Sequence, residues 1–217
     1  MNDLKPMRIS GIVLSTIGVV LILFSGIKTV TNFRILSDII QNILIFNIIL
    51  LIFMPERKRL LKSFILGIIV MIYDFLIETI AVKFEWWFPL SGTQYPPFLV
   101  IPLEMVISFF IIGSSFSLLF DLPERIEEIK DHRFVSLKKL FSKKYSIHIF
   151  RVILVVLNAF VGMHGDYSAP DEIWMPGENW SPLFTFLIWL SGGLLSVAVF
   201  YFIEYLMPNQ KEKPIFD

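Results

Sequence analysis

The chain of 217 residues contains no cysteine, and only 18% of its residues are charged. The absence of cysteine excludes disulfides, thiolate nucleophiles and Cys-ligated zinc or iron–sulfur centres. The 19 basic residues balance the 19 acidic ones, so the chain lacks the positive excess of a nucleic-acid-binding protein. Disorder is excluded as well, because 55% of the residues are hydrophobic, whereas disordered chains combine low hydrophobicity with high net charge.

Several catalytic motifs are also missing. The sequence has no Walker A motif, no G-x-G-x-x-G, and no Asp-rich cluster that would bind a diphosphate through magnesium. Its three histidines, His132, His148 and His164, lack the i, i+4 partner of a helical metal or haem site, and the Glu-x-x-His pattern of di-iron bundles is absent. We therefore expect no metal and no cofactor, which leaves proton chemistry by carboxyl groups.

Long apolar runs, by contrast, are abundant. A transmembrane helix needs about 20 mostly apolar residues. Segments that meet or approach this requirement lie at 9–27, 35–54, 63–82, 98–120, 147–163 and 183–207. The first is too long for the apolar region of a signal peptide, and no cleavage site follows it. The sequence predicts a single all-α domain over residues 1–217, a polytopic bundle of about six transmembrane helices.

The distribution of Lys and Arg predicts the orientation of this bundle. Nearly all basic residues fall in segments that six helices would place on one side; the exceptions are Lys28, Arg34, Lys83 and Arg151. Cytoplasmic loops are enriched in Lys and Arg. We therefore expect both termini in the cytoplasm and a multi-pass protein of the cell membrane. The basic loop 121–146 has apolar residues at helical spacing, which predicts either a helix lying on the inner leaflet or a solvated connector.

Two predicted outer loops carry the same short motif. Residues 85–89 read E-W-W-F-P and residues 172–176 read E-I-W-M-P, both of the form E-x-W-x-P. Each lies between an outgoing and an incoming helix, so residues 63–120 and 147–207 are candidates for two parallel copies of one hairpin. The alternative is shared composition, because Trp and Tyr favour the membrane interface.

Acidic residues lie inside the predicted helices, where ionisable groups are costly and usually face the bundle interior. Asp74 and Glu78 share one helix face because they are four residues apart. Glu104 lies about as far inside its helix as Glu78 does, which predicts a facing Glu78–Glu104 pair with Asp74 below. Two close carboxyls in a low dielectric cannot both ionise easily, and such a pair can donate and accept protons. The alternative is a set of interhelical hydrogen bonds without chemistry.

Two uncharged residues are predicted at a comparable depth on the last two helices. Asn158 can hydrogen-bond a carboxyl, and Trp189 can stack on an unsaturated substrate or fill the core.

Three further ionisable residues have structural interpretations. Glu204 and Arg151 are expected to pair with each other or to snorkel to the interface. Asp166 lies with His164, in G-M-H-G-D-Y, at the outer end of the fifth predicted helix, either as a proton donor or as part of an interfacial turn.

The stretch from Tyr73 to Phe110 reads Y-D-F-L-I-E-T, then F-E-W-W-F, then G-T, then I-P-L-E-M-V-I-S-F-F. It resembles the membrane lycopene cyclase domain of bacteria and archaea, which carries an acid-bearing helix, a Trp/Tyr-rich loop and a P-x-E-[ED] motif followed by a Phe pair. Met105 stands where that family has its second acid, and the second half of the chain has no P-x-E. The matching positions are Asp74, Trp86 or Trp87, Gly92, Pro102, Glu104, Phe109 and Phe110.

The resemblance implies that Glu104 is a catalytic acid in cyclising a polyene end group. The leading hypothesis is an integral membrane enzyme, a lycopene-cyclase-like isomerase or lyase. It would perform acid-catalysed, non-redox cyclisation, hydration or isomerisation of a carotenoid or other isoprenoid lipid. The candidate catalytic residues are Glu104, Glu78 and Asp74, and the candidate substrate-binding residues are Trp86, Trp87, Asn158 and Trp189. The alternatives are a small proton-coupled transporter or lipid-binding protein, and a non-catalytic structural membrane protein.

Overall fold

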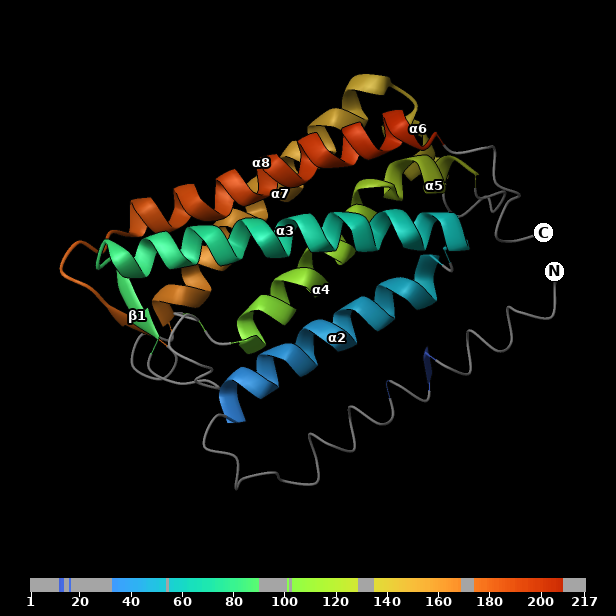
Figure 1. The fold of residues 1–217 in the computed structure, drawn as a ribbon. Coiled ribbons are helices and arrows are strands. Elements are labelled where there is room, and N and C mark those ends of the chain that lie inside the picture. Colours follow the sequence, from blue (N-terminus) through green and yellow to red (C-terminus); the bar gives the residue numbers. More distant parts are fainter. Residues whose placement is uncertain are drawn as a thin grey trace.

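The structure, a computed structural model, describes residues 12–13, 16, 33–53, 55–89, 101, 103–128, 135–168 and 174–208. It is an all-α bundle with one short two-stranded sheet (Figure 1). The elements in chain order are α2 (Phe33–Phe53), α3 (Arg57–Lys83), β1 (Trp87–Pro89), α4 (Leu103–Phe120), α5 (Leu122–Glu128), α6 (Val135–Phe141), α7 (Lys144–Ser168), β2 (Trp174–Pro176) and α8 (Pro182–Leu206).

Four helices of the described chain are long and apolar enough to cross a membrane: Arg57–Lys83, Met105–Glu127, Tyr145–Asp166 and Pro182–Leu206. They correspond to the predicted segments 63–82, 98–120, 147–163 and 183–207. The predicted segment 35–54 is the helix α2, whose shorter apolar part is Ile40–Ile52. The predicted segment 9–27 lies outside the described residues, apart from 12–13 and 16, which are helical.

Large apolar side chains cover the outside of these helices. On α3 the exposed residues Ile68, Ile72, Leu76 and Ile80 recur every four positions and form one stripe. Similar exposed residues on α7 and α8 include Ile149, Val152, Ile153, Leu157, Phe160, Val161, Leu183, Leu187, Leu194 and Phe202. An apolar surface of this extent is unfavourable in water and favourable against lipid. The bundle is therefore suited to a membrane, as its sequence predicts.

Small residues hold α3 and α4 close together. A Cβ at Gly67 would lie 2.2 Å from Ser114 Oγ and 2.6 Å from the backbone oxygen of Phe110, so α4 occupies the space of a side chain. Ser63 Oγ donates a hydrogen bond to the backbone oxygen of Ser114 at 2.9 Å across the same contact. Glycine and serine at helix contacts are typical of membrane bundles, because they let backbones approach closely.

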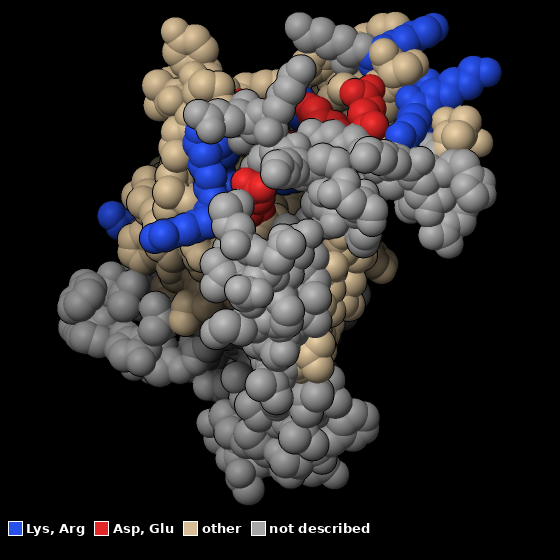
Figure 2. Space-filling view, turned by 90° about the vertical axis from the view of Figure 1, so that its right-hand side faces the viewer, with Lys and Arg blue, Asp and Glu red and all other residues tan. Residues whose placement is uncertain are grey.

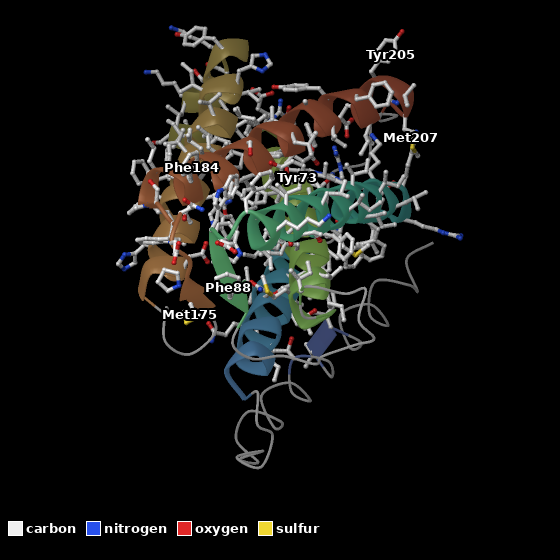
Figure 3. All side chains as sticks on the ribbon, turned by 60° about the vertical axis from the view of Figure 1, so that its left-hand side comes forward. Tyr73, Phe88, Met175, Phe184, Tyr205 and Met207 are labelled. Atoms are coloured by element: carbon white, nitrogen blue, oxygen red, sulfur yellow. The ribbon has the colours of Figure 1, made fainter. Side chains whose placement is uncertain are left out.

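The two E-x-W-x-P motifs meet in the sheet at one end of the bundle. Strands β1 and β2 pair antiparallel, with Trp87 opposite Pro176 and Pro89 opposite Trp174. Phe88 and Met175 form the central pair, and Figure 3 places both at this end of the molecule, which we call the aromatic end. The pairing is symmetric about the fourth position of the motif, so the Trp of each copy lies opposite the Pro of the other. Two copies related by a two-fold axis would pair in this way. The repeat itself stays a prediction.

The opposite end, which we call the basic end, holds a buried ion-pair network. Arg59 donates to Asp121 and, at 2.7 Å, to Glu204 Oε1. Lys62 Nζ donates to Glu204 Oε2 at 2.9 Å, and Arg125 Nε lies 3.3 Å from Asp121 Oδ2. Figure 2 views this end and shows blue basic side chains with red acidic ones between them. These pairs explain how α3 extends to Arg57, beyond the predicted span 63–82, because Glu204 of α8 and Asp121 between α4 and α5 neutralise its buried cations.

The predicted pair of Glu204 and Arg151 does not form in the structure. Glu204 accepts hydrogen bonds from α3 instead. Arg151 donates to Glu124 Oε1 at 2.5 Å, to the backbone oxygen of Phe120 at 2.9 Å and to the Tyr201 hydroxyl at 2.8 Å. The expected pair was wrong because Arg59 and Lys62 of α3 neutralise Glu204, while Glu124 of α5 lies beside Arg151.

The predicted surface helix of residues 121–146 contains two short helices, α5 and α6, in its described part. Ile126 and Phe141 are buried, and the ring of Phe141 lies 5.3 Å from that of Phe150 on α7. Val135 and Leu140 are exposed. The apolar residues of this loop are therefore divided between the bundle and the outer surface.

Candidate functional site

A cavity lies between α3, α4, α7 and α8, in the interior of the bundle. It encloses about 430 Å³ that is not filled by protein atoms, a volume that includes the open side. None of the described residues that line it carries a positive charge. The lining residues are Val70, Tyr73, Asp74, Glu78, Phe109, Ile112, Phe116, Asn158, Ile188, Trp189, Gly192, Gly193 and Ser196.

Four of the predicted site residues therefore share one cavity: Asp74, Glu78, Asn158 and Trp189. On α3, Val70, Asp74 and Glu78 recur every four residues, so the helix turns one face toward the cavity. Asn158 comes from α7 and Trp189 from α8, as the depth comparison in the sequence predicts.

Of the two carboxyls that line the cavity, Asp74 is the one with an unsatisfied oxygen. Its side chain is buried, at 3% exposure, and Oδ2 has no hydrogen-bond partner among the described residues. A buried polar atom without a partner costs free energy comparable to a lost hydrogen bond. In a cavity wall, such an oxygen is available to a ligand or can carry the proton of a neutral acid.

Glu78 has a fixed partner. The indole Nε1–H of Trp87 donates to Glu78 Oε2 at 2.7 Å, and both side chains are buried. Trp87 belongs to β1, so the strand pair at the aromatic end holds the donor in place. The hydrogen bond uses one carboxyl oxygen of Glu78 as an acceptor. Trp87 is not among the residues that line the cavity, so its link to the cavity is the hydrogen bond to Glu78.

Asp166 is a third carboxyl of this group and was not among the predicted site residues. Helix α7 continues to Ser168, so Asp166 is helical and the expected interfacial turn does not occur there. Asp166 Oδ2 accepts a hydrogen bond from Trp189 Nε1 at 2.7 Å. It also interacts electrostatically with Asp74 and Glu78. The spacing of Asn158, Gly162 and Asp166, every four residues, was the available signal.

Trp189 is packed tightly between two helices. A Cβ at Gly162 would lie 2.2 Å from Trp189 Cδ2, so the indole occupies the space beside the α7 backbone. On its other side, the ring of Phe109 on α4 lies 5.3 Å away at 32°. Both aromatic rings line the cavity. The cavity that contains Asp74 therefore has aromatic walls held by close packing.

Two other predicted site residues lie differently. Trp86 stacks on Phe184 of α8, with ring centroids 5.3 Å apart and planes 9° apart, and is not a cavity-lining residue. This stacking joins Trp86 to α8 at the aromatic end, and the substrate-binding role of Trp86 stays a prediction. Glu104 is the second residue of α4, and its side chain lies outside the described residues. The facing pair of Glu78 and Glu104 therefore stays a prediction.

Among the described residues, no group of three or more His, Cys, Asp or Glu side chains could hold a metal ion. The chain was also compared with models of protein families, with characterised proteins and with solved structures, and none of them matches it. The class of protein that the fold defines is an all-α bundle with membrane-spanning helices, and the chemistry of its function must be inferred from the cavity.

Proposed function

We propose that this protein is a multi-pass enzyme of the cell membrane that performs acid-catalysed, non-redox modification of an uncharged isoprenoid lipid. The observation that carries the proposal is the buried, unpartnered carboxyl oxygen of Asp74 in an aromatic-walled cavity. The described lining has no cation that would bind a phosphate or diphosphate group. The proposal is also supported by the resemblance of residues 73–110 to membrane lycopene cyclases.

In this proposal Asp74 is the proton donor. Its proton is transferred to an alkene carbon, the π electrons form the new C–H bond, and the adjacent carbon becomes a cation. A second double bond attacks this cation and closes a ring, and a neighbouring carbon then loses a proton to a carboxylate. The product is an isomer of the substrate, so no oxidant or reductant is required.

Neighbouring side chains have supporting roles in the proposal. Glu78 and Asp166 each accept an indole N–H, which stabilises the carboxylate form and suits a proton acceptor. The rings of Trp189 and Phe109 offer π faces to the cation, an attraction worth about 0.5–2 kcal/mol each. Asn158 lines the same cavity and can orient a carboxyl.

The test is expression in a host that accumulates an acyclic polyene such as lycopene. A product of unchanged redox state is expected, and Asp74→Asn should abolish it while the protein remains in the membrane. Glu178→Gln, an exposed acid at the aromatic end, is the matched control and should retain activity. Unchanged polyenes with all candidate isoprenoids would overturn the proposal.

The role of Glu104 can be separated from that of Asp74 in the same assay. The family resemblance implies that Glu104→Gln is inactive, whereas our proposal gives proton donation to Asp74. Loss of product in both variants would give the two carboxyls a shared role. Full activity of Glu104→Gln would remove Glu104 from the mechanism.

A second function, proton-coupled transport, is favoured by one observation. The half-buried carboxyl of Asp166 interacts with both acids of the cavity, so three carboxyls extend toward the aromatic end. Proton flux into proteoliposomes that depends on Asp74 and Asp166, without any lipid conversion, would support transport over catalysis.

A further inference from the structure

A polar contact interrupts the lipid-facing surface between α3 and α8. The hydroxyl of Tyr73 lies 2.5 Å from Ser191 Oγ. Ser191 Oγ donates its own proton to the backbone oxygen of Ile188 at 2.8 Å, so the Tyr73 hydroxyl is the donor. The exposed apolar residues Ile72 and Leu76 flank Tyr73 along α3. The hydrogen bond therefore lies on the hydrocarbon-facing side of the bundle.

Tyr73 also lines the cavity that contains Asp74. Figure 3 places Tyr73 where α3 and α8 run alongside each other. The α8 residues that face it are small, Ser191 and Gly192, and a Cβ at Gly192 would lie 3.3 Å from Tyr73 Cε1. The phenol ring is thus the large group at this level between the cavity and the lipid-facing surface.

The neighbouring part of the same contact is closed by apolar packing. Toward the basic end, Leu66 and Val70 of α3 pack with Ile203 of α8 in one buried cluster. Displacing that cluster would separate the helices, whereas moving Tyr73 requires a side-chain rotation and the loss of one hydrogen bond. Along the contact between α3 and α8, Tyr73 is therefore the side chain that can move without separating the helices.

We infer that Tyr73 is a gate through which an uncharged, lipid-dissolved ligand passes between α3 and α8 to reach Asp74. The inference rests on the proposed function, because it takes the cavity as the substrate site. In hydrocarbon, breaking the Tyr73–Ser191 bond leaves the Tyr73 O–H without an acceptor and without water to replace it, so the closed gate is the resting state. A ligand that enters must displace the ring.

The experiment measures access to Asp74 with dicyclohexylcarbodiimide, an apolar reagent for protonated carboxyls. The carboxyl O–H adds across one C=N bond, so that oxygen bonds to the central carbon and the proton goes to nitrogen. Transfer of the acyl group to nitrogen then gives a stable N-acylurea, and nothing leaves. The full chain in phosphatidylcholine vesicles is labelled, and mass spectrometry follows the peptide that contains Asp74.

Slow labelling is expected in the unaltered protein and none at this position in Asp74→Asn. Tyr73→Phe and Ser191→Ala should each accelerate labelling about threefold, the factor that one interhelical hydrogen bond in a bilayer is worth. The double variant should be no faster than either single one, because both remove the same bond. Tyr73→Ala should be faster still. If that variant fails to fold, Gly192→Ala tests the same ring by pushing it outward.

Phe109→Ala is the matched control, because it removes an aromatic ring from another side of the cavity. Acceleration by Phe109→Ala without acceleration by the Tyr73 variants would overturn the gate, as would equal labelling by a water-soluble carbodiimide. Absence of labelling in every variant would also overturn it. Failure of the proposed function is a separate result, in which lipids are unconverted but labelling still depends on Tyr73.

Discussion

At the scale of single residues, hydrogen bonds from indole N–H groups distinguish the buried carboxyls from one another. Trp87 and Trp189 donate to Glu78 and Asp166, while Asp74 Oδ2 has no donor in the described structure. Glu78 and Asp166 are therefore the candidate proton acceptors, and Asp74 is the candidate acid. Sequence spacing could place Asp74 and Glu78 on one face, but it could not reveal which indole reaches which carboxyl.

Trp87→Phe tests the stability that the first of these bonds supplies. The variant leaves Glu78 Oε2 buried without its donor, so the free energy of unfolding in detergent should fall by about 1–3 kcal/mol. Trp86→Phe makes the same change of ring in the neighbouring stacked residue and should cost less. In a cycle with Glu78→Ala, the two losses should be smaller together than their sum; full additivity would contradict the bond.

Gly162→Ala tests the packing of Trp189. The added Cβ would lie 2.2 Å from Trp189 Cδ2, so the indole must move and its bond to Asp166 must lengthen. Overpacking of this kind costs about 1–3 kcal/mol. The indole N–H resonance of Trp189 in a ¹⁵N spectrum should shift as well. Gly165→Ala is the control on the same helix, because nothing lies within 4 Å of the Cβ position there; equal shifts in both variants would contradict this packing.

At the scale of elements, the β1–β2 pair fixes the aromatic end. Gly177 follows β2, and its N–H donates to the backbone oxygen of Trp86 at 2.9 Å. A Cβ at Gly177 would lie 1.8 Å from the backbone oxygen of Glu85, which itself has a positive φ of 57°. The atoms that a Cβ would meet here belong to the backbone of Glu85 and Trp86, and they cannot move aside as a side chain can. Only glycine therefore fits at this position.

Gly177→Ala should therefore separate the two strands. We expect faster hydrogen–deuterium exchange in residues 84–89 and 174–180, with the four long helices unchanged. Glu178→Ala, at the adjacent exposed position, should leave exchange as it is. Protection of both strands in Gly177→Ala would show that the pairing does not depend on this close approach.

The helices were largely predictable from sequence, and the limits of the prediction are informative. Apolar length located α3, α4, α7 and α8, because a membrane span requires it. The start of α3 at Arg57 was not predictable, since buried Arg59 and Lys62 are tolerated only through acids from α8 and the α4–α5 junction. The helical end of α7 was missed because two glycines and a histidine suggested a turn.

Arg59→Met tests the network that joins these elements. Arg59 is one of two cations beside each buried acid, because Arg125 also lies beside Asp121 and Lys62 beside Glu204. Its removal should therefore cost less than the loss of a sole partner, and the free energy of unfolding should fall by about 1.5–3 kcal/mol, the value of hydrogen bonds to charged groups. Arg57→Met is the control, because Arg57 lies two residues earlier on α3 and is exposed, and this variant should be nearly neutral. Adding Asp121→Asn to Arg59→Met should recover part of the loss; no recovery would contradict charge as the cause.

At the scale of the whole molecule, the balanced charge separates into distinct regions. Basic residues gather at one end of the bundle (Figure 2), and the short strands that contain Trp87 and Trp174 lie at the other (Figure 1). The buried carboxyls of the cavity lie between these ends. Because Lys and Arg favour the cytoplasmic side, this asymmetry predicts that the basic end faces inward. It also predicts that Asp166, near the aromatic end, lies toward the outside.

The absence of cysteine makes this orientation directly testable. Glu178→Cys introduces a thiol at the aromatic end and Lys139→Cys one at the basic end, both at exposed positions. In intact cells, a membrane-impermeant maleimide should label Glu178→Cys only, and permeabilised cells should label both. The unaltered chain is the control without any thiol. The reverse pattern would place the basic end outside and the Asp166 end of the carboxyl group toward the cytoplasm.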